Sequence, residues 1–325
     1  MKIVSLLPSA TEIICALGLE ENLVGITHEC DYPASVARKP HLTASRISHE
    51  TMTSKEIDHA VRRQLDGHGS IYDLNTELLE ELDPDLIITQ ELCEVCAVSY
   101  KTVEKAARLY TADAQVVSLE PNTIADIFDN IRLVGELTNT TNKAEEVVEN
   151  LQNRLDNIRE RISEANPKPE TQNPKPEVFM LEWLEPPFSP GHWVPEQVAI
   201  AGGIALLGEA GKKSVTTTYE AICESKPEII VMIPCGYYTS DILRQLENTH
   251  FPADWREIPA VRSGNVWALD ATSYFSRPAP RVVRGAEILA KIFHPQIFGA
   301  PDQTEAVKVP RNLIKFAEKS AAGSS

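Results

Sequence analysis

The sequence lacks the features by which several classes of protein are recognised. It has no apolar run of membrane-spanning length. It has no excess of basic residues, and its formal net charge of −16 argues against a nucleic acid or an anionic membrane as the main partner. It also contains no nucleophile elbow, phosphate-binding loop or dinucleotide fingerprint. These absences lower the case for an enzyme without excluding one.

The sequence also shows no apolar leader of signal-peptide length, because Met1-Lys2 runs directly into a predicted strand at residues 3–7. We therefore expect a soluble, cytoplasmic protein. Six cysteines in 325 residues, without an export signal, do not predict a disulfide framework, and we expect reduced thiols. Cys15 and Cys223 are expected to be core residues.

Short apolar runs alternate with amphipathic segments along both halves of the chain. This alternation predicts an α/β fold with parallel sheets. The phrases at residues 83–88 (Asp-Pro-Asp-Leu-Ile-Ile) and 226–231 (Lys-Pro-Glu-Ile-Ile-Val) occupy equivalent places. We therefore expect two Rossmann-like lobes with a ligand crevice between them. Strands are predicted at residues 3–7, 23–26, 86–88, 115–119, 177–181, 228–233 and 265–269, and helices at residues 54–65, 76–82, 103–109, 193–201, 240–246 and 280–293.

A long helical pattern links the two halves. Thr123 is its expected N-cap, and the polar patch at residues 138–141 is expected to break it in two. The Pro-rich stretch that follows has no core residues and is expected to be an exposed insertion. The predicted division is 1–122 for the N-terminal lobe, 123–165 for the bridging helical segment, 166–176 for the insertion, 177–300 for the C-terminal lobe and 301–325 for a disordered tail.

Polar, reactive side chains follow two strands of the N-terminal lobe directly, at the sheet edge where α/β proteins bind ligands. One strand leads into His28 and Cys30, and the other leads into Glu91, Cys93 and Cys96. Thiolates and imidazole suit zinc, copper or iron, so His28, Cys30, Cys93 and Cys96 are candidate ligands of a zinc or iron site. A single Cys-x-x-Cys pair also fits a redox pair or two thiols that pack a helix start.

The C-terminal lobe offers aromatic side chains at equivalent places. Trp183 and Trp193, the latter beside His192, could pack against a flat macrocycle, although Trp183 could equally be lobe core. Tyr274, Phe275 and Arg277 would suit a planar, anionic or amide-rich ligand. Cys235, Gly236 and Tyr237 end another strand of this lobe.

The first helix of the chain begins beside the same sheet edge. Ser9, after Pro8, is expected to cap this helix, and Glu12 completes the spacing of a capping box. Backbone N–H groups at Ser9 could also bind an anion.

Several of these phrases resemble a known family, the Fe/B12-type periplasmic-binding domain, which is the class III solute-binding fold of importers for iron-siderophores, haem and cobalamin. The resemblance covers roughly residues 1–295 and is closest to the subgroup called cobalamin-binding proteins. It rests on the phrase at residues 8–12, the strand at 86–88, the helix between lobes, and the phrases at residues 28–33, 93–99, 191–195 and 274–278.

The resemblance implies a ligand-binding protein that holds cobalamin or a related corrinoid between two lobes and catalyses nothing. ABC importer subunits would be its partners, and we expect a monomer. The alternatives are a metal- or thiol-dependent enzyme that uses His28, Cys30, Cys93 and Cys96, and a binder of a ferric siderophore or haem. The expected ligand contacts are Pro8, Ser9, Tyr32, Glu91, Trp183, His192, Trp193, Cys235, Gly236, Tyr237, Tyr274, Phe275 and Arg277.

Overall fold

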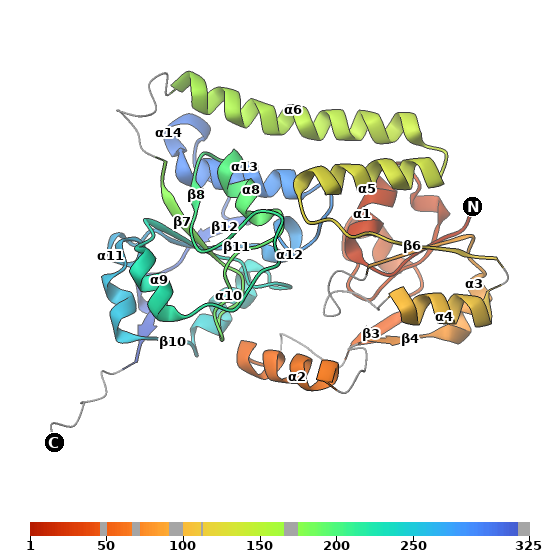
Figure 1. The fold of residues 1–325 in the computed structure, drawn as a ribbon, viewed down its shortest axis with the longest axis horizontal. Helices are drawn as coiled ribbons and strands as arrows, with labels where there is room; N and C mark the ends of the chain where they lie inside the picture. Colours follow the sequence, from red (N-terminus) through yellow and green to blue (C-terminus); the bar gives the residue numbers. More distant parts are fainter. Residues whose placement is uncertain (46–50, 67–71, 91–99, 112, 166–174, 318–325) are drawn as a thin grey trace. The chain divides into compact units, whose positions relative to one another are not determined.

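The fold is described from a computed structural model, which describes the chain except residues 46–50, 67–71, 91–99, 112, 166–174 and 318–325. The chain forms two compact α/β units (Figure 1). Unit 1 comprises Met1–Ser48, Glu56–Asn153 and Arg277–Pro280, and unit 2 comprises His49–Lys55, Arg154–Ser276 and Arg281–Ser325. The predicted fold class, two α/β lobes joined by helix, is confirmed.

Unit 1 is built on a four-stranded parallel sheet in the order β2-β1-β5-β6. Every residue of β5 is buried, as expected for a parallel strand that is covered on both faces. The strands are β1 (Ile3–Ser5), β2 (Leu23–Gly25), β5 (Leu86–Thr89) and β6 (Gln115–Ser118), and α1 (Pro8–Ala16), α3 (Thr76–Leu82) and α4 (Tyr100–Tyr110) alternate with them.

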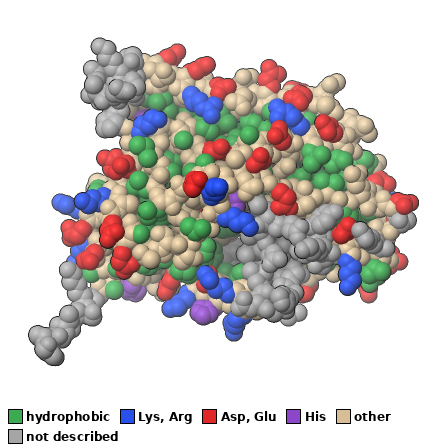
Figure 2. Space-filling view, viewed as in Figure 1, with side chains coloured by type: hydrophobic (Ala, Val, Ile, Leu, Met, Phe, Trp, Pro, Cys, Tyr) green, Lys and Arg blue, Asp and Glu red, His purple; other side chains and the backbone are tan. Residues whose placement is uncertain are grey.

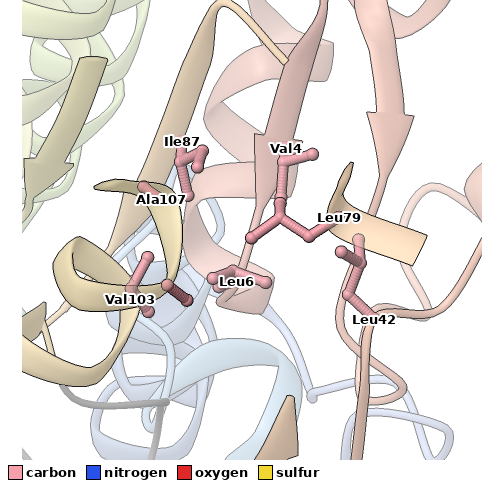
Figure 3. Close-up of a cluster of buried hydrophobic side chains, with 8 residues drawn as sticks. Val4, Leu6, Leu42, Leu79, Ile87, Val103 and Ala107 are labelled. Carbon is pink, nitrogen blue, oxygen red and sulfur yellow. The ribbon is translucent and has the colours of Figure 1, made fainter. Parts of the chain in front are cut away.

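One face of this sheet is closed by a cluster of aliphatic side chains that point toward one another (Figure 3). The cluster joins the strands to α3 and α4 and is almost fully withdrawn from water, so its burial stabilises unit 1. Its members are Val4, Leu6, Leu42, Leu79, Ile87, Val103, Ala106 and Ala107.

The start of α1 differs from the predicted cap. The helix begins at Pro8, its N-cap is Leu7, and no side chain caps it. The prediction that Ser9 is the N-cap is therefore wrong. Pro8 has no N–H and a fixed φ, and both favour the first turn of a helix, so the helix starts before Ser9.

The long helical pattern is two helices, as predicted. Helix α5 (Ile124–Leu137) is capped by Thr123, whose hydroxyl accepts the N–H of Asp126 at 3.1 Å. Asn139, with φ of +57°, turns the chain into α6 (Thr141–Ala165). Gly135 allows the two helices close approach, because a Cβ there would lie 2.5 Å from the Cβ of Ala144. The boundary between the units falls within α6, between Asn153 and Arg154.

Two further pieces complete unit 1. Strands β3 (Thr43–Ser45) and β4 (Tyr72–Leu74) form an antiparallel pair. Most of α2 (Ser54–Asp66) belongs to this unit, although its first residues are counted with unit 2. Short 3-10 turns occur at Glu20–Asn22 and Ala34–Arg38.

Unit 2 is built on a five-stranded sheet in the order β12-β11-β9-β7-β8, in which only β12 is antiparallel to its neighbour. The strands of its centre, β7 and β9, end in the segments that carry the candidate ligand contacts. The bounds are β7 (Glu177–Leu181), β8 (Ile204–Ala205), β9 (Ile229–Met232), β11 (Val266–Leu269) and β12 (Ala306–Lys308).

Helices and short turns cover this sheet. Helix α8 packs on α13, and the buried amide of Gln197 joins them by donating to the carbonyls of Val282 and Tyr274 at 2.7 and 3.0 Å. The helices are α8 (Val194–Ile200), α9 (Tyr219–Ser225), α10 (Thr239–Leu246), α11 (Pro259–Ser263), α12 (Ala271–Tyr274), α13 (Val282–Phe293) and α14 (Pro295–Phe298), with a 3-10 turn at Ala253–Glu257.

The C-terminal segment corrects another prediction. Residues 301–317 are not a disordered tail, because β12 pairs with β11, β13 (Lys315–Phe316) pairs with β10 (His250–Phe251), and a 3-10 turn lies at Arg311–Leu313. Val309 and Ile314 are buried. Arg284 of α13 also donates to both carboxylate oxygens of Glu305, at 2.7 and 2.8 Å. Buried apolar residues, strand pairing and the Arg284–Glu305 pair together hold this segment to unit 2.

On the face shown in Figure 2, acidic and basic side chains are interspersed with apolar ones. Among the described residues, no helix is long and apolar enough to cross a membrane. The predicted Pro-rich insertion, residues 166–176, lies outside the described residues except at its last two positions.

Candidate functional site

The loop that follows β2 in unit 1 holds His28 through a chain of hydroxyl groups. The Thr43 hydroxyl lies 2.7 Å from His28 Nδ1 and donates to the Thr27 hydroxyl at 2.9 Å. Burial lowers the pKa of His28 below its usual range, so the imidazole is neutral at neutral pH, the form in which histidine binds metal.

Cys30 lies in the same loop, but its thiol points into the unit. The residue is 4% exposed, and its Sγ lies 3.0 Å from the hydroxyl of Thr11, which in turn donates to Ser5. Burial raises the pKa of Cys30 to about 12. The thiol is therefore protonated at neutral pH, which disfavours nucleophilic chemistry at this position.

The other predicted thiol ligands, Cys93 and Cys96, lie outside the described residues, as does Glu91. The shared centre with His28 and Cys30 is therefore still a prediction. Within the described part of the chain, no group of three or more His, Cys, Asp or Glu side chains is arranged to hold a metal ion.

Arg277 is the residue of the second half that joins the β2 loop of unit 1. Its guanidinium donates to the carboxylate of Asp31 and, at 2.8 Å, to the carbonyl oxygen of Glu29. Only 11% of its side chain is exposed, whereas the neighbouring Tyr32 is 47% exposed. Pro8 and Ser9 are buried in the first turn of α1. Unit 1 therefore presents Tyr32 and Asp31 on the loop after β2, with the guanidinium of Arg277 bound to Asp31.

In unit 2, the loop after β7 carries His192 and Trp193. Trp193 is 5% exposed, and its indole N–H donates to the carbonyl of Phe275 at 2.8 Å. Phe275 is 2% exposed. His192 has φ of +50°, and its pKa is lowered by burial and by Lys213. Trp193 and Phe275 thus form part of the unit's own packing.

The residues after β7 and β9 also meet within unit 2. Trp183 packs edge-on against Tyr237, with ring centroids 5.5 Å apart, and its indole N–H donates to the carbonyl of Ser54. Cys235 is exposed, and Gly236, with φ of +81°, has open space around it. Cys235 and Gly236 are therefore accessible, whereas Tyr237 is buried.

The remaining candidate, Tyr274, ends α12. Its side chain is half-buried, and burial raises the pKa of its phenol. Its backbone carbonyl accepts from Gln197. Tyr274 therefore combines a fixed backbone with a partly accessible ring.

The sequence analysis did not assign a role to Glu182, which directly follows β7. Its carboxylate accepts a hydrogen bond from Ser214 and, at 3.2 Å, another from the N–H of Gly191. The signal that could have identified it is its place, an acidic residue at the carboxyl end of a buried strand. Ser214 lies 32 residues further along the chain, so this partner could not be read from local pattern.

Comparison with known proteins places these loops in context. The family model "Periplasmic binding protein" matches residues 3–272. The chain is 23% identical to "Vitamin B12-binding protein" of Vibrio cholerae over 291 residues, 88% of this chain and 86% of that protein. It is 25% identical to "Uncharacterized ABC transporter substrate-binding lipoprotein YvrC" of Bacillus subtilis over 91% of this chain and 81% of that protein.

Solved structures with the same fold include proteins named for two macrocycles. A periplasmic haem-binding protein from Pseudomonas aeruginosa superposes with a TM-score of 0.67 at 19% identity, covering 91% of this chain and 93% of that chain. The vitamin B12-binding protein BtuF of Vibrio cholerae superposes with a TM-score of 0.61 at 22% identity, covering 90% and 96%. At these identities the likeness shows the fold.

The comparisons contradict one prediction. A cytoplasmic location was expected from the residues that precede the first strand, but the matching family is that of periplasmic binding proteins and one relative is named a lipoprotein. These findings point to a location outside the cytoplasm.

The comparisons also bear on the kind of activity. Proteins of this type bind substrates and are not enzymes, which agrees with the lack of catalytic motifs in the sequence. The match extends over most of both units, from β1 to α12. The chain belongs to the periplasmic binding protein family, and it is a ligand-binding protein.

Proposed function

We propose that this protein is the substrate-binding component of an ABC importer and that its substrate is cobalamin or a related corrinoid. The observation that carries the proposal is the match to "Vitamin B12-binding protein" of Vibrio cholerae, which extends over 88% of this chain and 86% of that protein. The membrane subunits of the importer would be its partners.

The accessible candidates in each unit support a large ligand with polar edges. Unit 1 offers the exposed ring of Tyr32 beside the Arg277–Asp31 pair. Unit 2 offers Cys235, Gly236 and the partly accessible ring of Tyr274. Aromatic rings supply contact area, and a guanidinium supplies directed donors to amide or carboxylate oxygens. Within unit 2, the buried Trp193 would hold the backbone next to Tyr274 in place, because its indole N–H donates to the carbonyl of Phe275.

Titration of the purified protein with cyanocobalamin, dicyanocobinamide and haemin tests the proposal, with binding followed by calorimetry and by the absorption of each macrocycle. We expect saturable binding of both corrinoids at one site per chain. If only haemin binds, haem and not a corrinoid is the substrate. Absence of binding by all three at high micromolar concentration would overturn the macrocycle proposal.

The Arg277→Ala variant tests the proposed contact in unit 1. If Arg277 donates to the ligand, its removal should weaken corrinoid binding by about 1.5–3 kcal/mol, the range of a hydrogen bond to a charged group. Arg38→Ala, which removes an exposed arginine of the same unit, is the matched control. Equal affinities of the two variants would exclude Arg277 from the site.

A bound zinc or iron ion at His28, Cys30, Cys93 and Cys96 is a separate proposal. Its support is the residue types and the neutral imidazole of His28. Metal analysis of the protein and of a Cys93→Ser, Cys96→Ser double variant tests it, and equal metal contents would contradict it.

A further inference from the structure

The carboxyl group of Glu182 fastens two passes of the chain in unit 2, an outgoing pass between β7 and α8 and a returning pass between β8 and α9. The outgoing pass runs through Phe188 and the turn at residues 191–193, and the returning pass runs through Ser214. Phe188 bridges both Trp183 and Thr216. Glu182 accepts from the N–H of Gly191 on the outgoing pass and from the hydroxyl of Ser214 on the returning pass. A single side chain at the strand end therefore ties both passes.

The two passes are in close backbone contact at the same place. A Cβ on Gly191 would overlap the backbone nitrogen of Ser214 and come within 2.7 Å of the carbonyl oxygen of Lys212. The N–H of His192 donates to the Lys212 carbonyl at 2.5 Å, and the N–H of Gly211 donates back to the His192 carbonyl at 2.9 Å. His192 takes up a left-handed backbone conformation there. The turn therefore has little freedom while the tie holds.

The turn also sets the position of Trp193. This residue is the N-cap of α8, and its indole N–H is held by the Phe275 carbonyl. Movement of the turn at residues 191–193 would shift Trp193 and, through it, the segment of Tyr274 and Phe275. Glu182 thus influences the positions of Trp193, Tyr274 and Phe275, which are proposed ligand-binding residues, although Glu182 itself is not one of them.

The tie is sensitive to ionisation. Glu182 is half-buried, and burial raises the pKa of its carboxyl group to about 7, against the lowering effect of the hydrogen bonds from Ser214 and Gly191. The other titratable or charged groups around it are His192, Lys212 and Lys213 on the two passes, Glu185 beyond β7, Tyr219 of α9, which donates to the Leu184 carbonyl, and Cys235, whose backbone N–H donates to the Glu182 carbonyl.

The sign of the effect follows from linkage. A carboxyl that reaches water ionises near 4.5, whereas the tied carboxyl does so near 7. Between these values the tied form binds more protons, so raising the pH favours states in which the carboxyl is hydrated. The full shift corresponds to a factor on the order of a hundred in the equilibrium between the tied and the open turn.

We propose that Glu182 is a positioning residue of the ligand site, that its neutral carboxyl holds the turn at residues 191–193 in place, and that its ionisation releases this turn and lowers ligand affinity. This inference rests on the proposed function, since the affinity concerned is that for the same macrocycle. Binding would thus be tighter in mildly acidic surroundings than in alkaline ones.

The test compares wild-type protein with three variants over pH 5.5–8.5. Glu182→Gln keeps the shape of the neutral carboxyl but does not ionise. Its amide oxygen can still accept from Gly191, and its NH2 group can donate to the Ser214 hydroxyl, which donates to Glu182 in the wild type. Ser214→Ala removes the hydrogen bond from the Ser214 hydroxyl, which lowers the pKa of Glu182. Glu209→Gln makes the same chemical change at an exposed position of the returning pass, where no effect is expected.

Two readouts separate this inference from the proposed function. The first, without ligand, is hydrogen–deuterium exchange of the peptide at residues 189–194, corrected for the intrinsic rate at each pH. The second is the affinity for cyanocobalamin. As the pH rises from 5.5 to 8.5, wild type and Glu209→Gln should lose tenfold or more both in protection of this peptide from exchange and in affinity for cyanocobalamin. In Glu182→Gln both quantities should change less than twofold. In Ser214→Ala the loss should occur at a higher pH than in wild type.

Each outcome decides one question. Protection that follows this pattern without any corrinoid binding would support the tie and reject the proposed ligand. Binding with the same pH profile in wild type and Glu182→Gln would overturn the inference and leave the proposed function standing. A pH dependence abolished instead by His192→Asn, which tolerates the left-handed backbone, would assign the effect to the imidazole and also overturn the inference.

Discussion

At the scale of single residues, burial decides which side chains can do chemistry. Cys30 and Cys235 both follow a strand of their unit, yet Cys30 is enclosed beside Thr11 whereas Cys235 is exposed. The thiolate is the reactive form of cysteine, and burial removes both the thiolate and its access to reagents. The sequence patterns around the two cysteines do not distinguish these environments.

We therefore predict that iodoacetamide labels Cys235 but not Cys30 in the native protein at pH 8. A pKa of about 12 in place of the usual value of 9.0 lowers the thiolate fraction of Cys30 roughly a thousandfold. Peptide mass mapping after a timed reaction measures both sites, and labelling in urea is the control that makes Cys30 accessible. Labelling of native Cys30 at the rate of Cys235 would contradict the buried geometry.

Gly191 is a second residue whose surroundings set a strict requirement. A methyl group there would meet backbone atoms of Lys212 and Ser214, which cannot turn aside as a side-chain end can. Gly191→Ala should lower the free energy of unfolding by roughly 1–3 kcal/mol, the usual cost of overpacking. Urea unfolding measures it. The control is Lys213→Ala, an exposed change in the returning pass, which is expected to be within about 0.5 kcal/mol of wild type. Equal stabilities would show that the two passes can separate at little cost.

At the scale of elements, local sequence signals placed most helices and strands. Asn75 and Thr123 cap α3 and α5 as their residue types suggest, and the buried runs at β5 and β9 are read directly from their apolar residues. These signals depend on residues that are close together in the sequence, so they can be read without knowledge of the tertiary structure. The predicted N-cap of α1, Ser9, lies two residues after the observed one, Leu7, because two local signals, Pro8 and Ser9, competed.

Elements stabilised by distant partners were not predictable in the same way. Residues 301–317 contain no long apolar run, and their order comes from pairing with β10 and β11 and from Glu305 on Arg284. For the same reason the sequence indicated that Trp193, Phe275 and Arg277 lie near strand ends but not which groups they contact. Arg277, from the second half of the chain, is counted with unit 1 through Asp31 and Glu29.

We predict that the C-terminal segment contributes to the stability of unit 2. Ile314→Ala deletes a side chain that is 5% exposed and should cost about 2–5 kcal/mol. Asn312→Ala, an exposed change two residues earlier, should cost less than about 0.5 kcal/mol. Thermal unfolding followed by tryptophan fluorescence compares them, and equal melting temperatures would mean that this segment is not packed in solution.

At the scale of the whole molecule, two units with separate sheets share one chain that crosses between them several times. Each unit has its own buried strands, so each has the means to fold as a cooperative block. Helix α6 contributes to both, since Arg154 pairs with Glu287 of α13 in unit 2 while the residues before it belong to unit 1. Whether the two units unfold together depends on all the segments that connect them and not on any single contact.

The distribution of tryptophan makes this testable, because Trp183, Trp193, Trp255 and Trp267 all belong to unit 2. Fluorescence therefore reports unit 2, whereas far-ultraviolet circular dichroism reports both units. Ile87 of β5 and Ile230 of β9 occupy equivalent places in the two central strands, and both are fully buried. Truncation of either to alanine should cost about 2–5 kcal/mol in its own unit.

We predict that Ile87→Ala separates the two signals in urea, with circular dichroism lost in two steps and fluorescence changing only in the second, because unit 2 keeps its core. In Ile230→Ala the fluorescence transition should move to lower urea and precede or coincide with the first loss of circular dichroism. A saturating corrinoid, if it contacts both units, should bring the two transitions of Ile87→Ala together, because a ligand stabilises only the state that binds it. Coincident single transitions in both ligand-free variants would show that α6 and the crossing segments couple the units into one cooperative block.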